Sequence, residues 1–392
     1  MSSTARSRLV VFLFVPLFLV AAAFVVASIP YTTYTRGIYA FLVCLLIADL
    51  ALGLRGRWRD AAILIAATVF GLAAIELISA ALEDKLRIVE TKGFSISHPV
   101  LGWGPSGPGV FHARRTRADG TLIYDVDYTI DDRLLRRTLS APTGPSVVFF
   151  GDSFTFGLGL SDSDTLPQYY ADLTERKIRV LNFAFPAYGP QQVLRALETG
   201  LFDLLLSDAQ IFVYLTAGWH IERSSCLAGY TARAPRYELR DGKAVYVGPC
   251  VVGLNKVFQA IFNGAGYRRL VQPVVNVVRA PDVELYLAEL RSTAELVKRK
   301  YHARLVILYL SESDEFLARS GFTDAMIKER LRQSAIELVD ASLSPADFPP
   351  GTLFKIPGDS HPTAIANRAR AVVLRNYLDE SPITSVVLPR AK

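Results

Sequence analysis

Two short motifs of this sequence together hold the side chains that can activate a serine. Ser153 lies in the run Gly151-Asp152-Ser153-Phe154, and Asp359 and His361 lie two residues apart near the carboxyl end. A serine hydroxyl is a poor nucleophile at neutral pH and needs a base within hydrogen-bond reach, whose tautomer a third group must fix. A carboxylate can contact an imidazole two residues away in a turn. We therefore expect Asp359 to orient His361, and His361 to act as the base for Ser153 in acyl-transfer chemistry.

Short apolar runs that alternate with helical segments must position these residues. This pattern begins at residue 146 and is typical of a parallel sheet that is buried on both faces. In a doubly wound sheet, functional groups gather at the carboxyl ends of the strands. The ends of the expected strands are followed by Ser153, Gly189, His220 and the Asp359–His361 pair, so we expect these groups at one edge. The expected strands are 147–150, 179–182, 211–215, 305–310 and 353–356.

These motifs resemble the conserved blocks of the SGNH/GDSL hydrolase superfamily, and specifically its membrane-anchored bacterial members with a Gly-Asp-Ser-Phe motif. The resemblance covers residues 145–376. It implies an α/β, three-layer, flavodoxin-like SGNH fold with a five-stranded parallel sheet. It also implies Ser153 as the nucleophile, Asp359 as the orienting carboxylate and His361 as the base.

The resemblance further implies an oxyanion hole made by the backbone N–H groups of Ser153 and Gly189 and by one side chain. Members of the superfamily usually carry Gly-x-Asn-Asp for that side chain, whereas this chain has Gly218-Trp219-His220-Ile221. Aligned residue by residue, His220 takes the place of the asparagine. An imidazole can donate a hydrogen bond, so His220 is expected to complete the oxyanion hole with a strength that depends on pH.

The first 82 residues hold the apolar excess of a chain that is 51% hydrophobic and only 20% charged. Three apolar runs, 9–29, 38–54 and 61–82, are each near the ~20 residues that a helix needs to cross a bilayer. We therefore predict three transmembrane helices. The acidic residues Asp49 and Glu76 lie near span ends, where we expect them to reach interfacial water.

Arginines give the topology of these spans. Arg6, Arg8 and the arginines of 55–59 mark the cytoplasmic side, while the first loop has only Arg36. Three spans then place everything after residue 83 outside the cytoplasm, so we expect an inner-membrane protein with a cytoplasmic amino terminus and a periplasmic catalytic domain. The net charge of +6 is scattered, so nucleic-acid binding is not expected.

Cysteine usage agrees with an exported domain. Cys226 and Cys250 both fall in the exported part, where an oxidising compartment permits a disulfide, and we predict that they pair; the alternative is two free buried thiols. Cys44 lies inside the second span as a small apolar filler. No His-Cys or Cys-x-x-Cys cluster indicates a metal, and no cofactor is expected.

The expected domains are a transmembrane anchor (1–82), an extended and β-hairpin collar (83–144), and a catalytic domain (145–392) with an insertion at about 224–280. The collar contains a predicted hairpin of 110–117 with 122–130, and the insertion contains another around Asp241-Gly242. An apolar stretch, 257–278, follows in the insertion. It can cover the active site, lie on the membrane surface or simply pack on the sheet.

The leading hypothesis is a membrane-anchored serine esterase that removes O-acyl groups, most simply O-acetyl groups, from an envelope glycan or lipid. The alternative is an O-acetyltransferase acting on an exported polysaccharide, similar to alginate O-acetyltransferases, together with polysaccharide-assembly proteins as partners. A second alternative, motivated by the altered third block, is a non-catalytic envelope scaffold. Nothing in the residues separates hydrolysis from transfer, because only the accepting nucleophile differs.

Overall fold

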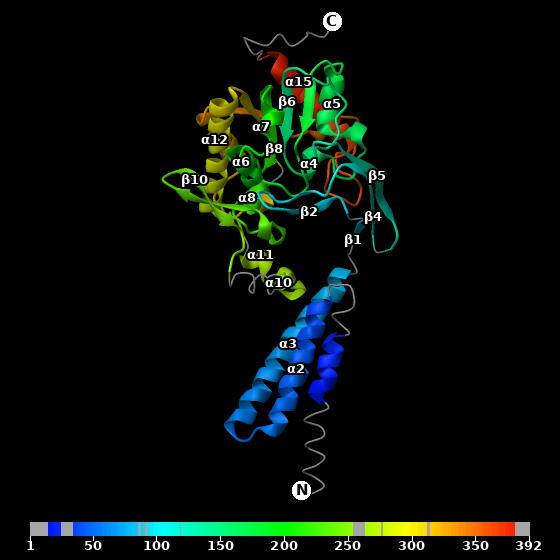
Figure 1. The fold of residues 1–392 in the computed structure, drawn as a ribbon, viewed down its shortest axis with the longest axis vertical. Helices are drawn as coiled ribbons and strands as arrows, with labels where there is room; N and C mark the ends of the chain where they lie inside the picture. Colours follow the sequence, from blue (N-terminus) through cyan, green and yellow to red (C-terminus); the bar gives the residue numbers. More distant parts are fainter. Residues whose placement is uncertain are drawn as a thin grey trace. The chain divides into compact units, whose positions relative to one another are not determined.

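The structure is a computed structural model of the 392-residue chain and describes residues 15–24, 34–84, 88–90, 93–117, 119–253, 263–275, 277–311 and 314–380. The chain divides into two compact units. The first unit comprises Met1–Arg87 and Lys256–Val275, and the second comprises Ile88–Asn255 and Asn276–Lys392 (Figure 1). This division differs from the domains expected from the sequence. The collar from residue 88 onward belongs to the same unit as Ser153 and His361, and residues 256–275 of the insertion belong to the amino-terminal unit.

The described part of the first unit is helical. Its helices α2 and α3 are long and apolar enough to cross a membrane, and apolar side chains such as Leu64 and Leu72 are exposed along α3. The predicted span 9–29 is described only over the helix Val15–Phe24, and the rest of it lies outside the described residues. The bounds are α2 Thr35–Gly53, α3 Arg57–Asp84, α10 Ala265–Leu270 and α11 Gln272–Val275.

A five-stranded parallel sheet forms the centre of the second unit, in the order β12-β11-β8-β6-β7. This is the flavodoxin-like order, so the predicted fold class is confirmed. The fifth strand was wrongly placed at 353–356, because the true one is a four-residue edge strand with charged residues at both ends and no continuous apolar run. The bounds are β6 Ser146–Phe150, β7 Arg179–Asn182, β8 Ala209–Ala217, β11 Arg304–Leu310 and β12 Glu337–Asp340.

Helices cover both faces of this sheet (Figure 1). Side chains alternate along β6, so that Val148 and Phe150 pack with α6, α12 and α14, whereas Val147 and Phe149 pack with α5 and α15. Both faces are therefore buried, which accounts for the apolar strands. The bounds are α5 Leu166–Leu173, α6 Pro190–Glu198, α12 Ala280–Tyr301, α14 Asp324–Gln333 and α15 Ala364–Glu380.

The collar packs directly against the nucleophile region. Its Tyr128 lies edge-on to Phe156 of α4, with ring centroids 5.3 Å apart, and the hydroxyl of Tyr128 accepts a hydrogen bond from Gly159 N. The predicted hairpin is confirmed as β4 paired with β5. The bounds are β1 Ile88–Glu90, β2 Ser95–His98, β3 Gly102–Pro105, β4 Gly109–Arg117, β5 Leu122–Ile130 and α4 Ser153–Phe156.

The insertion contains the second predicted hairpin, confirmed as β9 paired with β10, and the structure joins Cys226 to Cys250 by a disulfide. This bond closes 24 residues and links the segment after α8 to the end of β10. A loop of that size is worth about 3 kcal/mol in the chain-entropy model. The other bounds are α7 Asp203–Leu206, α8 His220–Ser224, β9 Pro235–Arg240, β10 Lys243–Pro249, α13 Asp314–Leu317, and the 3₁₀ helices Asp162–Asp164, Gly229–Arg233 and Pro345–Asp347.

Candidate active site

Ser153 begins helix α4 directly after strand β6. The turn between them needs glycine at position 151, where φ is 154° and an added Cβ would lie 2.2 Å from Thr155 Oγ1. Asp152 caps the helix, since its Oδ1 accepts a hydrogen bond from Phe154 N at 2.9 Å. In the described part of the chain, the Ser153 N–H has no acceptor, which leaves it available at the start of the helix.

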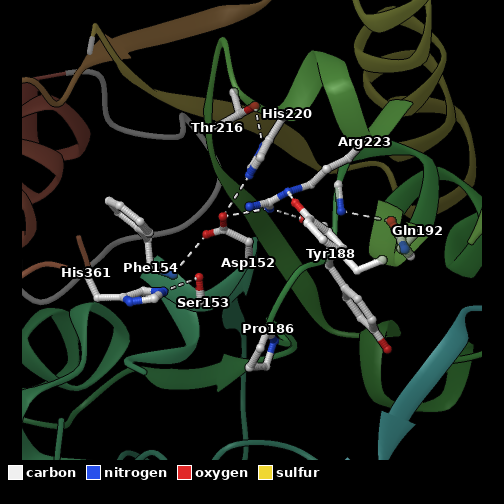
Figure 2. Close-up of polar contacts among 12 residues, drawn as sticks. Asp152, Ser153, Phe154, Pro186, Tyr188, Gln192, Thr216, His220, Arg223 and His361 are labelled. Carbon is white, nitrogen blue, oxygen red and sulfur yellow. Dashed lines mark hydrogen bonds and ion pairs between the residues drawn. The ribbon is translucent and has the colours of Figure 1, made fainter. Parts of the chain in front are cut away.

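Ser153, His361 and Asp359 form a connected chain of hydrogen bonds across 208 residues of sequence. Ser153 Oγ lies 2.8 Å from His361 Nε2 (Figure 2), and His361 Nδ1 contacts Asp359 Oδ1. The same Oδ1 accepts a hydrogen bond from His361 N at 2.8 Å, so the turn itself positions the ring. With Nδ1–H held by a carboxylate, Nε2 is left as an acceptor for the serine proton.

Arg115 of β4 holds the other oxygen of this carboxylate, with Nη1 at 2.6 Å from Asp359 Oδ2. The Asp359 side chain is only 2% exposed and that of Arg115 is 21% exposed, so the pair is largely shielded from water. Burial raises the pKa of Asp359, but hydrogen bonds and charge from His361, with the charge of Arg115, outweigh burial and lower the pKa to about 2. The collar thus contributes directly to the site, a role that no feature of its sequence indicates.

An aromatic wall lies beside the triad. The Phe154 ring is 5.6 Å from the His361 ring and 5.1 Å from the Trp219 ring, measured between centroids. Phe154 packs beside the imidazole, whose side chain is only 14% exposed. Shielding of this kind strengthens the hydrogen bonds of the triad because it excludes water.

Behind the nucleophile, Asp152 joins a buried polar cluster with His220 and Arg223 of α8 (Figure 2). Asp152 Oδ2 lies 2.7 Å from Arg223 Nη1 and 3.0 Å from His220 Nε2. Burial by itself raises the pKa of Asp152, yet the Arg223 guanidinium and the His220 ring hold that pKa far below its usual range. Arg223 Nη1 also donates to Tyr188 O at 2.6 Å, so the cluster ties together the loops that follow three strands.

His220 lies inside the buried cluster and not on a surface open to a substrate, in contrast to the oxyanion role that the sequence alignment predicts. Its side chain is completely buried, and its Nδ1 lies 2.8 Å from Thr216 Oγ1 and 3.1 Å from Tyr214 Oη. Burial, followed by the charge of Arg223, lowers the pKa of His220, which favours the neutral ring. Because an ionised Asp152 only accepts hydrogen bonds, Nε2 carries the proton and Nδ1 accepts. Neither ring nitrogen is left to donate to a substrate.

Gly189 also departs from its expected role. Its N–H donates to Gln192 Oε1 at 2.8 Å as part of the cap of α6, so it is not free for an oxyanion. Glycine is needed here for packing, since an added Cβ would lie 3.0 Å from Arg223 Cβ. The N–H of Ala187, two residues earlier, has no acceptor in the described residues, and Ala187 adopts the left-handed φ of 67°.

The Ala187 segment is near the nucleophile turn, because Phe185 N donates to Gly151 O at 3.3 Å. A non-glycine residue with positive φ is uncommon and stores strain that surrounding structure must hold. The sequence alone does not single out Ala187, which is an ordinary alanine in a loop; only its backbone conformation distinguishes it.

No group of three or more His, Cys, Asp or Glu side chains in the described residues is arranged to hold a metal ion.

No family model and no curated protein matches this chain. Solved structures with a similar fold include a member of the lipolytic protein G-D-S-L family from Veillonella parvula, 12% identical, which covers 60% of this chain and 99% of that protein with a TM-score of 0.35. A carbohydrate acetylesterase family member from Sinorhizobium meliloti is 13% identical and covers 60% of this chain and 98% of that protein, with a TM-score of 0.34.

Proposed function

We propose that this protein is a serine ester hydrolase of the SGNH/GDSL type, anchored in a membrane by its amino-terminal helices. The observation that carries the proposal is the hydrogen-bonded chain Ser153–His361–Asp359, in which a weak nucleophile meets a base and the base meets a buried carboxylate. As substrates we propose O-acyl groups, most simply O-acetyl groups, of an envelope glycan or lipid on the outer face of the inner membrane.

In the proposed reaction, Ser153 Oγ attacks the ester carbonyl carbon while His361 Nε2 takes its proton. His361 then returns this proton to the departing alcohol, which leaves an acyl-enzyme on Ser153. The same nitrogen then deprotonates a water molecule, which attacks the acyl carbon; the bond from this carbon to Ser153 Oγ breaks, His361 returns the proton to Oγ, and the acid is released. If a sugar hydroxyl replaces water in the last step, the same residues transfer the acyl group instead.

We further propose that the oxyanion is held by two backbone donors, the N–H groups of Ser153 and Ala187. Both lack an acceptor in the described residues, and Ala187 belongs to the loop that is hydrogen-bonded to the nucleophile turn. Each preorganised donor of this kind is worth roughly 2.7–4 kcal/mol of transition-state stabilisation. The role given to His220 in the sequence is thus replaced by backbone groups.

The non-catalytic alternative was motivated by the altered third block. The buried contacts of His220 with Asp152 and Thr216 supply a structural reason for that alteration, so it no longer argues against activity.

The test uses the full chain in detergent with p-nitrophenyl acetate and a fluorophosphonate probe, with and without an acetyl-accepting oligosaccharide. We expect ester turnover and labelling that disappear in Ser153→Ala and persist in the control Ser163→Ala, which changes an exposed serine of the same unit. Equal turnover in the wild type and in Ser153→Ala would refute the assignment. An acetylated oligosaccharide, detected by mass spectrometry, would identify transfer.

A further inference from the structure

Residues 263–275 lie in the middle of the chain, yet they pack with the amino-terminal helices in the first unit. They form the two short helices α10 and α11. The chain consequently passes between the two units three times, after Arg87, after Asn255 and after Val275. Residues 263–275 therefore belong to the unit of α2 and α3 and not to the unit that contains the central sheet.

A carboxylate of α3 fixes the start of α10. Glu76 Oε1 accepts a hydrogen bond from Ala265 N at 2.7 Å, and Oε2 accepts one from Gly266 N at 2.8 Å. Glu76 lies six residues before the end of the apolar run 61–82, or about 9 Å along the helix. A carboxylate at that depth in a bilayer is costly unless it is paired. The two N–H groups supply this pairing, so Glu76 does not depend on interfacial water.

Close packing and an ion pair reinforce this docking. An added Cβ on Gly266 would lie 3.0 Å from Ile75 Cγ2 and 3.3 Å from Glu76 Oε2, so glycine permits the approach of α10 to α3. Arg268 Nη2 lies 2.5 Å from Glu83 Oε2, on the same side of α3 two turns further along. The helix is therefore held at two levels near the outer end of the proposed span.

The docked segment leaves apolar side chains uncovered. Leu270 and Val275 are 58% and 53% exposed, and Val271 and Val274 are exposed beside them. Arg268 and Arg269 flank this apolar group and are also exposed. Short helices with exposed apolar residues beside arginines suit the boundary between headgroups and acyl chains. The segment is docked on α3, which is long and apolar enough to cross a membrane. If α3 spans the bilayer, the surface next to the segment is therefore the boundary between headgroups and acyl chains.

We propose that residues 263–275 form an interfacial membrane segment, docked on α3 through Glu76 and Gly266, which inserts Leu270, Val271, Val274 and Val275 into the outer leaflet of the bilayer. The inference rests on the membrane anchoring in the proposed function, and not on the esterase activity. The chain enters and leaves this membrane-bound segment, after Asn255 and after Val275, so the second unit has two further chain connections to the membrane besides the one after Arg87. A substrate that is itself at the membrane surface suits an enzyme tethered in this way.

The test measures the depth of a fluorophore on the full chain in phosphatidylcholine–phosphatidylglycerol vesicles. Leu270→Cys or Val275→Cys, in a Cys44→Ala background, is labelled with an environment-sensitive dye without reduction, so that the disulfide cysteines do not react. We expect blue-shifted emission that lipid-attached spin labels quench. The same dye on Leu204→Cys, at an exposed position of α7 in the second unit, is expected to show neither effect.

A dye on Leu72→Cys, on the exposed surface of α3, separates the possible failures. Quenching at Leu72 together with water-like emission at Leu270 would overturn the interfacial segment and leave the anchor standing. Blue-shifted emission at Leu270 without lipid quenching would show that protein covers the segment, which also overturns the proposal. No quenching at Leu72 would overturn the anchor and the segment together. None of these outcomes depends on ester turnover.

Docking itself is tested by Glu76→Gln and Gly266→Leu, each combined with the dye at Leu270. An amide has one acceptor oxygen for two N–H donors, and a leucine at 266 has no room beside Ile75. We expect lipid quenching at Leu270 to fall at least about twofold in both variants. Fluorophosphonate labelling of Ser153 at the wild-type level serves as the folding control. Unchanged quenching in both variants would overturn the docking contacts.

Discussion

Replacing Arg115 by methionine tests whether the collar takes part in catalysis. The substitution removes the hydrogen-bond partner of Asp359 Oδ2. The Asp359 side chain is only 2% exposed, and its other oxygen, Oδ1, already accepts a hydrogen bond from His361. A hydrogen bond to a charged group contributes roughly 1.5–3 kcal/mol, and each 1.36 kcal/mol is a factor of ten in rate. If the carboxylate must keep its orientation through the transition state, we expect kcat to fall about 10- to 100-fold with KM nearly unchanged.

In the proposed mechanism Arg115 is a positioning residue, because it contacts Asp359 and would act on Ser153 only through Asp359 and His361. The assay is therefore the second-order rate of fluorophosphonate labelling of Ser153, together with kcat and KM for p-nitrophenyl acetate and the thermal midpoint of each variant. Arg115→Lys keeps the charge and is expected to recover part of the rate. Arg114→Met is the matched control, since Arg114 is the neighbouring strand residue and is exposed. Wild-type labelling by Arg115→Met, or an equal loss in Arg114→Met, would refute the reasoning.

Two further predictions concern the nucleophile turn. Asp152→Asn leaves the buried Arg223 without its charge partner and is expected to lower the free energy of unfolding by about 3–5 kcal/mol, measured by urea denaturation. The pKa of Asp152 is lowered in the folded state. Its contribution to the free energy of unfolding is therefore complete above the unfolded pKa of about 3.9 and decreases as the pH falls below that value. The Asp152→Asn variant should lack this decrease. Ala187→Pro removes an N–H and cannot adopt a φ of 67°, whereas Ala187→Gly keeps the N–H and relieves the strain. We expect kcat to fall at least about 100-fold in Ala187→Pro and to change little in Ala187→Gly. Equal kcat values in the two variants would exclude the Ala187 N–H as an oxyanion donor.

Most of the sheet and the hydrogen-bonded chain of Ser153, His361 and Asp359 could be predicted because their signals are local. The runs before Gly151 and after Arg304 are apolar at every position, and Asp359 and His361 need only a turn to meet. Strand β12 has no such signal, because it is an edge strand that pairs only with β11 and has just two apolar residues between two acidic ones. Contacts between distant segments, such as Arg115 with Asp359 and Glu76 with Gly266, depend on the finished fold and leave no periodicity in the sequence.

The case of His220 shows why a match of position is not a match of role. A histidine aligned with an oxyanion donor predicts a pH-dependent donor, but the ring points instead at Asp152, where Arg223 has already fixed a carboxylate. A neutral, buried ring that donates to that carboxylate strengthens the cap of α4 and so holds the Ser153 N–H in place. The proposed donors are then both backbone amides, which do not titrate. The pH profile of acyl transfer should accordingly show no transition that arises from the oxyanion hole.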